Sequence, residues 1–143
     1  MKLDYNTKDF KDLKISELKR IAEYFFRKHL LSAAIRNARG EIFCPLKERW
    51  YGESEVQVAH FRDRNHLDTA FDLDNCNLIS KISNVWDAKE PYKEYKSLHH
   101  YEYENWLRKK IGDKKVDKLL DNTRNYTIFA RDVYLKTIDE YRK

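Results

Sequence analysis

The sequence has few residues that break regular secondary structure. Its 143 residues include only three Gly and two Pro. Because these two residue types most often interrupt helices and strands, their scarcity predicts a helix-rich fold. The two cysteines, Cys44 and Cys76, form no CxxC pair. Their simplest interpretation is two reduced, partly buried thiols in a cytosolic protein.

The sequence also lacks targeting and membrane signals. No secretory signal and no apolar run of membrane length is present, and there is no internal repeat, low-complexity tract or basic tail. We therefore expect a soluble cytoplasmic protein with no membrane partner.

Aromatic and charged residues are abundant. Aromatic residues make up 14 % of the chain and charged residues 37 %, and the net charge is +5. The aromatics supply enough buriable surface for one real core, so a single domain over residues 1–143 is expected. The positive charge suits a polyanionic partner only weakly, because basic and acidic side chains are interspersed.

The hydrophobic pattern divides the chain into an N-terminal helical arm (1–40), a middle section (41–90) and a C-terminal helical region (91–143). In the arm, an apolar stripe predicts an amphipathic helix that Ser16 caps and that ends before Gly40. The other face of this helix is basic and carries Lys19, Arg20, Arg27, Lys28 and Arg36.

Short strands are predicted in the middle section. Residues 41–44 form one extended run, and residues 56–61 alternate so that Val56, Val58 and His60 share a face. A short helix is expected from Ser80 to Trp86. In the last third the pattern predicts helices over residues 98–111, 113–120 and from Thr127 onward.

The chemistry is expected within residues 58–84. His60 ends a strand, Asn75 follows on a loop, and Asn84 lies nine residues later on the expected helix. This is the order and spacing of an HNH, or ββα-metal, nuclease core. An imidazole can take a proton from the attacking water, and a divalent ion can stabilise the leaving oxygen. Asn75 can orient either the loop backbone or the imidazole.

The chain resembles a known family over residues 40–142, the NinG (Rap) family of lambdoid phage recombination nucleases. The resemblance rests on F-C-P at 43–45, A-H-F-R at 59–62 and A-F-D-L-D-N at 70–75. It continues through Asn84 and W-L-R-K-K-I-G at 106–112, K-V-D-K-L-L at 115–120 and Y-T-I at 126–128. It implies an α+β fold with a small ββα-metal core between flanking helices, and endonuclease activity on branched DNA.

The chain departs from the family at its zinc-binding cysteines. The family pattern has two CxxC pairs flanking the histidine, but here only Cys44 remains, with Lys47, Ser80 and Ser83 at the other three positions. A structural zinc site needs four Cys or His ligands, so no structural zinc is expected. The finger is expected to be held by packing of large side chains instead, namely Trp50, Phe43, Phe71 and Trp86.

The metal site is expected to rest on few protein ligands. Ala59 stands where many HNH motifs have an acidic or histidine ligand. Asn84 is therefore the best candidate ligand for Mg²⁺ or Mn²⁺, with waters and a DNA phosphate completing the shell. Asp63 and Asp87 are candidate helpers, and the sequence does not decide between them.

Basic side chains around the motif are candidates for phosphate contact. Arg62 is predicted to bind the scissile phosphate or to stabilise the transition state, in addition to the proposed catalytic roles of His60 and Asn75. The remaining contacts would position DNA without reading its sequence. The candidates are Arg62, Arg64, His66, Lys47, Arg49 and Lys81.

Three functions remain open at this point. The leading one is a metal-dependent, structure-specific DNA endonuclease that hydrolyses phosphodiester bonds in recombination intermediates such as Holliday junctions or D-loops. The alternative is a catalytically degenerate HNH-like accessory protein that binds DNA without cutting it, and the third is a small basic phage assembly factor. Symmetric cutting of a junction favours a homodimer, paired through the N-terminal or the C-terminal helix.

Overall fold

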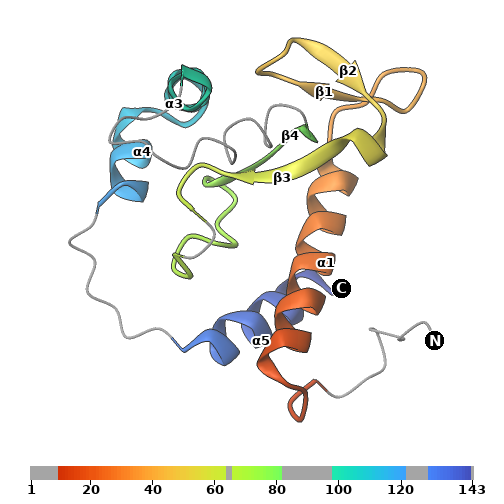
Figure 1. Ribbon diagram of the computed structural model, residues 1–143, viewed down its shortest axis with the longest axis vertical. Coiled ribbons are helices and arrows are strands. Elements are labelled where there is room, and N and C mark those ends of the chain that lie inside the picture. The colour runs from red at the N-terminus through yellow and green to blue at the C-terminus, as the bar shows by residue number, and fades with distance from the viewer. Residues whose placement is uncertain (1–9, 64–65, 82–97, 122–128, 143) are drawn as a thin grey trace. The chain divides into compact units, whose positions relative to one another are not determined.

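The structure is a computed structural model that describes residues 10–63, 66–81, 98–121 and 129–142. Within them the chain is an α+β protein with helices and two small antiparallel sheets (Figure 1). Its contacts cluster into two compact units, residues 1–33 with 125–143 and residues 34–124. The division therefore does not follow the predicted boundaries at residues 40 and 90.

In its described residues, the unit that contains both ends of the sequence consists mainly of two helices. Helix α1 spans Ile15–Ala33 and helix α5 spans Ala130–Tyr141, and the two pack against each other (Figure 1). Phe26 and His29 of α1 contact the ring of Tyr141, at centroid distances of 5.3 and 4.7 Å. Four residues of the predicted apolar stripe are buried, namely Leu18, Ile21, Ala22 and Phe25. The stripe was also expected to include Leu30, which is half-buried, and Ala33, which is exposed, whereas Phe26 is buried without having been predicted.

The ends of these helices differ from the prediction. Ser16 does not cap α1 but lies inside its first turn. The amides of Glu17 and Leu18 both donate to the carbonyl of Lys14, which precedes the helix. The helix ends at Ala33, and Gly40, with φ +76°, belongs to a separate turn in which the Asn37 side chain accepts from two amides. Thr127 lies outside the described residues, and the residue that precedes α5 is Phe129.

The other unit begins with two antiparallel hairpins. Strand β1 (Ile42–Cys44) pairs with β2 (Arg49–Tyr51). After the short 3₁₀ helix η1 (Glu53–Glu55), strand β3 (Val56–His60) pairs with β4 (Cys76–Ser80). Ser80, predicted to begin a helix, is thus the last residue of a strand. The rest of that predicted helix beyond Lys81 lies outside the described residues.

Helices α3 (Leu98–Ile111) and α4 (Asp113–Leu119) complete this unit, close to the predicted bounds. Gly112, with φ +91°, separates them in a conformation that a residue with a side chain rarely adopts. Their apolar side chains join the hairpins in one core. Its buried members are Cys44, Ala59, Phe61, Ile79, Tyr103, Leu107, Val116 and Leu119.

Phe43 and Trp50, two of the large side chains expected to hold the finger, contact each other across the first hairpin but lie outside its buried face. They are cross-strand partners whose ring centroids lie 5.2 Å apart, yet they remain 39 % and 42 % exposed. Side chains alternate along a strand, so the burial of Ile42 and Cys44 turns Phe43 to the opposite face. Phe71 is half-buried, and Trp86 lies outside the described residues.

No helix among the described residues combines the length and the apolar character needed to cross a bilayer.

Candidate functional site

The candidate site is built on the end of strand β3 and the loop that joins it to β4. His60 is the last residue of β3 and is half-buried. Its Nε2 lies 2.8 Å from the carbonyl oxygen of Ala70 in the loop. Because a carbonyl can only accept a hydrogen bond, Nε2 must carry the proton. The basic nitrogen of the neutral imidazole is therefore Nδ1.

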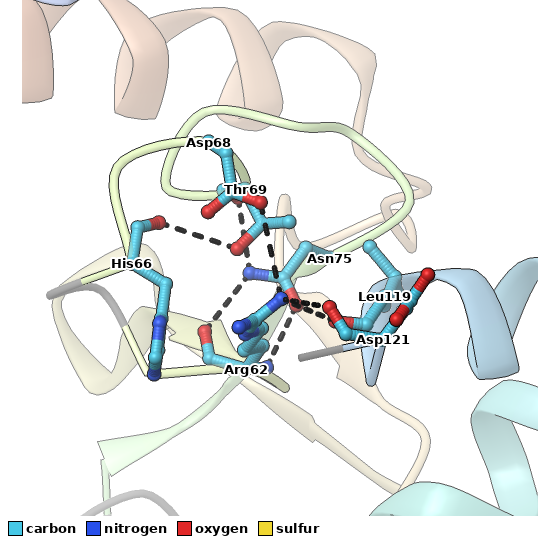
Figure 2. A network of polar contacts seen from close by, with 7 residues as sticks. All are labelled: Arg62, His66, Asp68, Thr69, Asn75, Leu119 and Asp121. Carbon is cyan, nitrogen blue, oxygen red and sulfur yellow. Dashed lines mark hydrogen bonds and ion pairs between the residues drawn. The ribbon is translucent and has the colours of Figure 1, made fainter. Parts of the chain in front are cut away.

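Asn75 closes the loop beside His60. Its side chain is fully buried; Oδ1 accepts from the amide of Arg62 at 2.7 Å, and Nδ2 donates to the carbonyls of Arg62 and Thr69, both at 3.0 Å. Its backbone carbonyl accepts from the amide of Phe61. Of the two roles left open by the sequence, these contacts correspond to orientation of the loop backbone (Figure 2).

Arg62 points its guanidinium into the protein. The side chain is 11 % exposed, and Nη1 donates to the carbonyls of Leu119 at 3.0 Å and Asp121 at 3.3 Å, where helix α4 ends (Figure 2). The same nitrogen lies 3.8 Å from the carboxylate of Asp68. A cation at a helix C-terminus satisfies carbonyls that have no partner within the helix. This placement favours a structural role for Arg62 over contact with a phosphate.

The middle of the loop is folded by its own hydrogen bonds. Thr69 is fully buried, and both its amide and its hydroxyl donate to the carbonyl of His66. The His66 ring and the Asp63 side chain belong to exposed residues. Sequence reasoning missed Thr69 and Ala70 because their contribution lies in backbone carbonyls, which residue type does not reveal.

Cys76 lies in the strand that faces His60. It is buried, and its thiol donates to the Ala70 carbonyl at 3.3 Å. Burial raises the pKa of Cys76 above its ordinary value, and the charge of Asp72 raises it further. Because a metal ligand must be a thiolate, this environment disfavours Cys76 as a ligand.

Behind β3 and β4, a chain of polar contacts connects the hairpin to α3. The hydroxyl of the buried Tyr103 donates to the Ala59 carbonyl at 3.0 Å and accepts from Asn77 Nδ2 at 3.2 Å. Lys110 donates to Asn77 Oδ1 at 2.7 Å and lies 5.1 Å from the centre of the Trp106 ring. Much of Lys110 is exposed, but desolvation of its ammonium lowers its pKa.

Two of the four positions that correspond to the family's zinc ligands, Cys44 and Ser80, lie in contact. The Ser80 amide donates to Cys44 Sγ at 3.3 Å, which joins the first hairpin to the end of β4. The turn after Cys44 is closed by a 2.8 Å bond from the amide of Glu48, whose φ is +54°. Lys47 is exposed in this turn, and Ser83 lies outside the described residues.

The remaining predicted residues are only partly brought together. Arg49 is exposed on β2 and Lys81 directly follows β4. Arg64, Asn84 and Asp87 lie outside the described residues. Among the residues that are described, no three His, Cys, Asp or Glu side chains gather where they could hold a metal ion.

Comparison with protein-family models, curated proteins and solved structures found no match to this chain.

Proposed function

We propose that this protein is a metal-dependent DNA endonuclease that cuts branched recombination intermediates, related to the NinG family and built on an HNH-like hairpin. The observation that carries the proposal is the contact of His60 Nε2 with the Ala70 carbonyl. It orients the ring, and in the tautomer that donates through Nε2 the basic ring nitrogen is Nδ1. A general base must have this lone pair directed at the attacking water.

The loop geometry supports the same proposal. Asn75 holds the residues directly after His60 in place through the backbone of Arg62. The imidazole is thus supported by a strand on one side and a pinned loop on the other, as a precisely placed proton acceptor requires.

The proposed ion is Mg²⁺ or Mn²⁺. When bound, it would supply the positive charge that the phosphorane and the leaving oxygen require. Asp63, three residues after His60, offers an oxygen donor of the kind these hard ions prefer. Asn84 remains the leading proposed ligand and Asp87 a further candidate.

The proposed homodimer would match the two-fold symmetry of a junction, although the apolar faces of α1 and α5 already pack against each other.

A second candidate function is a DNA-binding accessory protein without cleavage. The contacts of Arg62 favour this second candidate. Its guanidinium donates to carbonyls at the end of α4, so these donors are not directed at a phosphate. In this view the pinned loop is a stable remnant of an active site.

A junction-cleavage assay separates the two candidates. We expect nicking of a synthetic four-way junction that depends on Mg²⁺ or Mn²⁺ and stops in EDTA. His60→Ala should reduce the rate by about 10²–10⁴-fold while junction affinity stays within a few-fold. A His60→Ala protein that cuts at the wild-type rate would remove His60 from the site. Tight binding by the wild type with no cleavage in either metal would favour the accessory protein.

A further inference from the structure

The two units carry different charge. The described residues of the unit that contains the candidate site hold 12 Lys or Arg against 13 Asp or Glu. Those of the α1–α5 unit hold nine basic against six acidic side chains. A protein that binds DNA derives much of its affinity from neutralised phosphates. The described part of the site-bearing unit has no excess of positive charge for this purpose.

Several cations of the site-bearing unit are also engaged internally. Arg62 bonds to the end of α4, and Arg36 pairs with Glu53 at 3.0 Å. Arg108 bridges three carboxylates of α3 and α4, those of Glu104, Asp113 and Asp117.

In the α1–α5 unit, the excess of basic residues belongs to α1 and the segment before it. From Phe10 to Ala33 there are six basic and three acidic side chains, whereas residues 129–142 have three of each. Exposed carboxylates also occupy the outer surface of α5: those of Asp132, Asp139 and Glu140. A polyanion approaching this unit would therefore be attracted to α1 and not to α5.

Arg20, Tyr24 and Lys28 form one row on α1, at intervals of four residues. All three are exposed, Tyr24 by 47 %, while the buried Ile21 and Phe25 lie on the face toward α5. Neither Arg20 nor Lys28 makes an ion pair with a residue that the structure describes. Glu23, one of the two acidic residues of α1, lies instead 4.0 Å from Lys19.

We propose that this row (Arg20, Tyr24 and Lys28) binds the sugar-phosphate backbone of DNA. The inference rests on the proposed function for its choice of polyanion. Arg, Lys and Tyr are all side chains that donate to phosphate oxygens. Positions i to i+8 span about 12 Å along a helix, so the row can contact successive phosphates of one strand. It positions DNA without reading its sequence and leaves the chemistry to the other unit.

The test is junction binding by the full chain in EDTA, measured by fluorescence anisotropy across a range of salt concentrations. The row variant is Arg20→Gln with Lys28→Gln. The matched control is Lys115→Gln with Lys136→Gln, which removes the same charge from exposed lysines of α4 and α5. We expect the row variant to bind at least about tenfold more weakly than wild type. The slope of the logarithm of the binding constant against the logarithm of the salt concentration should become shallower by about 2, because each phosphate contact contributes about 0.9 to that slope. The control should stay within about threefold of wild type.

Three results would overturn the inference. Equal weakening of row variant and control would mean that only net charge matters, and unchanged binding by the row variant would remove the row from the interface. Normal DNA binding with lost self-association would assign the row to a second copy of the chain. In each case the wild-type protein still binds the junction, so these results overturn the row without overturning the proposed function, which the cleavage assay tests. A wild type that does not bind the junction would overturn both proposals.

Discussion

The buried side-chain amide of Asn75 connects two parts of the loop that follows His60. It accepts from the backbone amide of Arg62 and donates to the carbonyl of Thr69. Every polar atom of its side chain has a backbone partner, so the position discriminates sharply between an amide and its closest analogues. Asp is nearly the same size but has no donor when ionised. Its second oxygen would face the carbonyls of Arg62 and Thr69.

Asn75→Asp is therefore predicted to lose about 2–4 kcal/mol of stability at neutral pH, since a buried carboxylate meets two acceptors. Burial raises the pKa of the introduced carboxyl in the folded state above its unfolded value. The folded variant then binds a proton that the unfolded chain releases, so its deficit relative to wild type should shrink as pH falls toward about 4. Urea denaturation at several pH values measures this.

Asn75→Ala provides the control. It loses the same contacts without adding a titratable group, so its deficit should show no comparable dependence on pH. If both variants responded to pH alike, the side chain would not be oriented by the carbonyls of Arg62 and Thr69.

At the residue scale, the structure shows which contacts the predicted site residues make, and some of these contacts differ from those expected. Asn75 was expected to orient either the loop backbone or the imidazole, and its side chain bonds to the loop backbone of Arg62 and Thr69. Arg62 was predicted to face a phosphate. The sequence does not reveal that its guanidinium bonds to the end of α4, because that helix end lies 57 residues further along the chain. Contacts at such separations are set by tertiary packing, which local patterns do not encode.

At the scale of elements, Arg62 joins the loop after β3 to helix α4. Arg62→Ala is predicted to destabilise the protein by about 1–3 kcal/mol, because carbonyls at the end of α4 lose a charged donor. Hydrogen exchange should show faster exchange in α4 than in wild type. A variant of wild-type stability with weakened DNA binding would instead restore Arg62 as a phosphate ligand.

Helix α3 is joined to the strands by the hydroxyl of Tyr103. Tyr103→Phe keeps the ring in the core but leaves the Ala59 carbonyl and the Asn77 amide without this partner. The expected cost is about 1–3 kcal/mol, measured by thermal or urea denaturation. Tyr101→Phe, on an exposed position of the same helix, should leave stability within about 0.5 kcal/mol. Equal effects of the two substitutions would contradict a specific role for the buried hydroxyl.

Among the elements, helices α3 and α4 follow their predicted ranges, whereas the end of α1 and the short strands β2 and β4 do not follow the prediction. Leu98–Ile111 follows the predicted range because its apolar spacing and Gly112 agree. Strand β2 has only three residues, and Ser80 lies where a strand pattern gives way to polar residues. Short segments carry too few positions for periodicity to identify them, and pairing across the sheet decides their state.

At the scale of the whole molecule, the division into two units predicts separable stability. Phe25→Ala in α1 and Leu107→Ala in α3 each remove a large buried side chain. Each should cost about 2–5 kcal/mol, but in different places. Hydrogen exchange should accelerate in α1 and α5 for the first variant, and in β3, β4 and α3 for the second. Uniform acceleration in both variants would show that the chain unfolds as a single unit.

The pairing of residues 15–33 with residues 130–141 could not be predicted from the pattern. Both segments are amphipathic, and one or the other of them was expected to pair subunits. An apolar face shows only that a helix needs a partner, since any face of matching shape can cover it. The structure supplies that partner from the same chain.

The discontinuous unit has a consequence for how the protein is made. Helix α1 leaves the ribosome before its partner α5, which follows only after residues 34–129 have been translated. At about 5–20 residues per second, the apolar face of α1 waits on the order of ten seconds for its partner. During that interval the central unit can already fold, while Leu18, Phe25 and Phe26 remain open to chaperones or to neighbouring nascent chains. Chains released before α5 is translated would have a folded central unit and an α1 helix whose apolar face stays exposed.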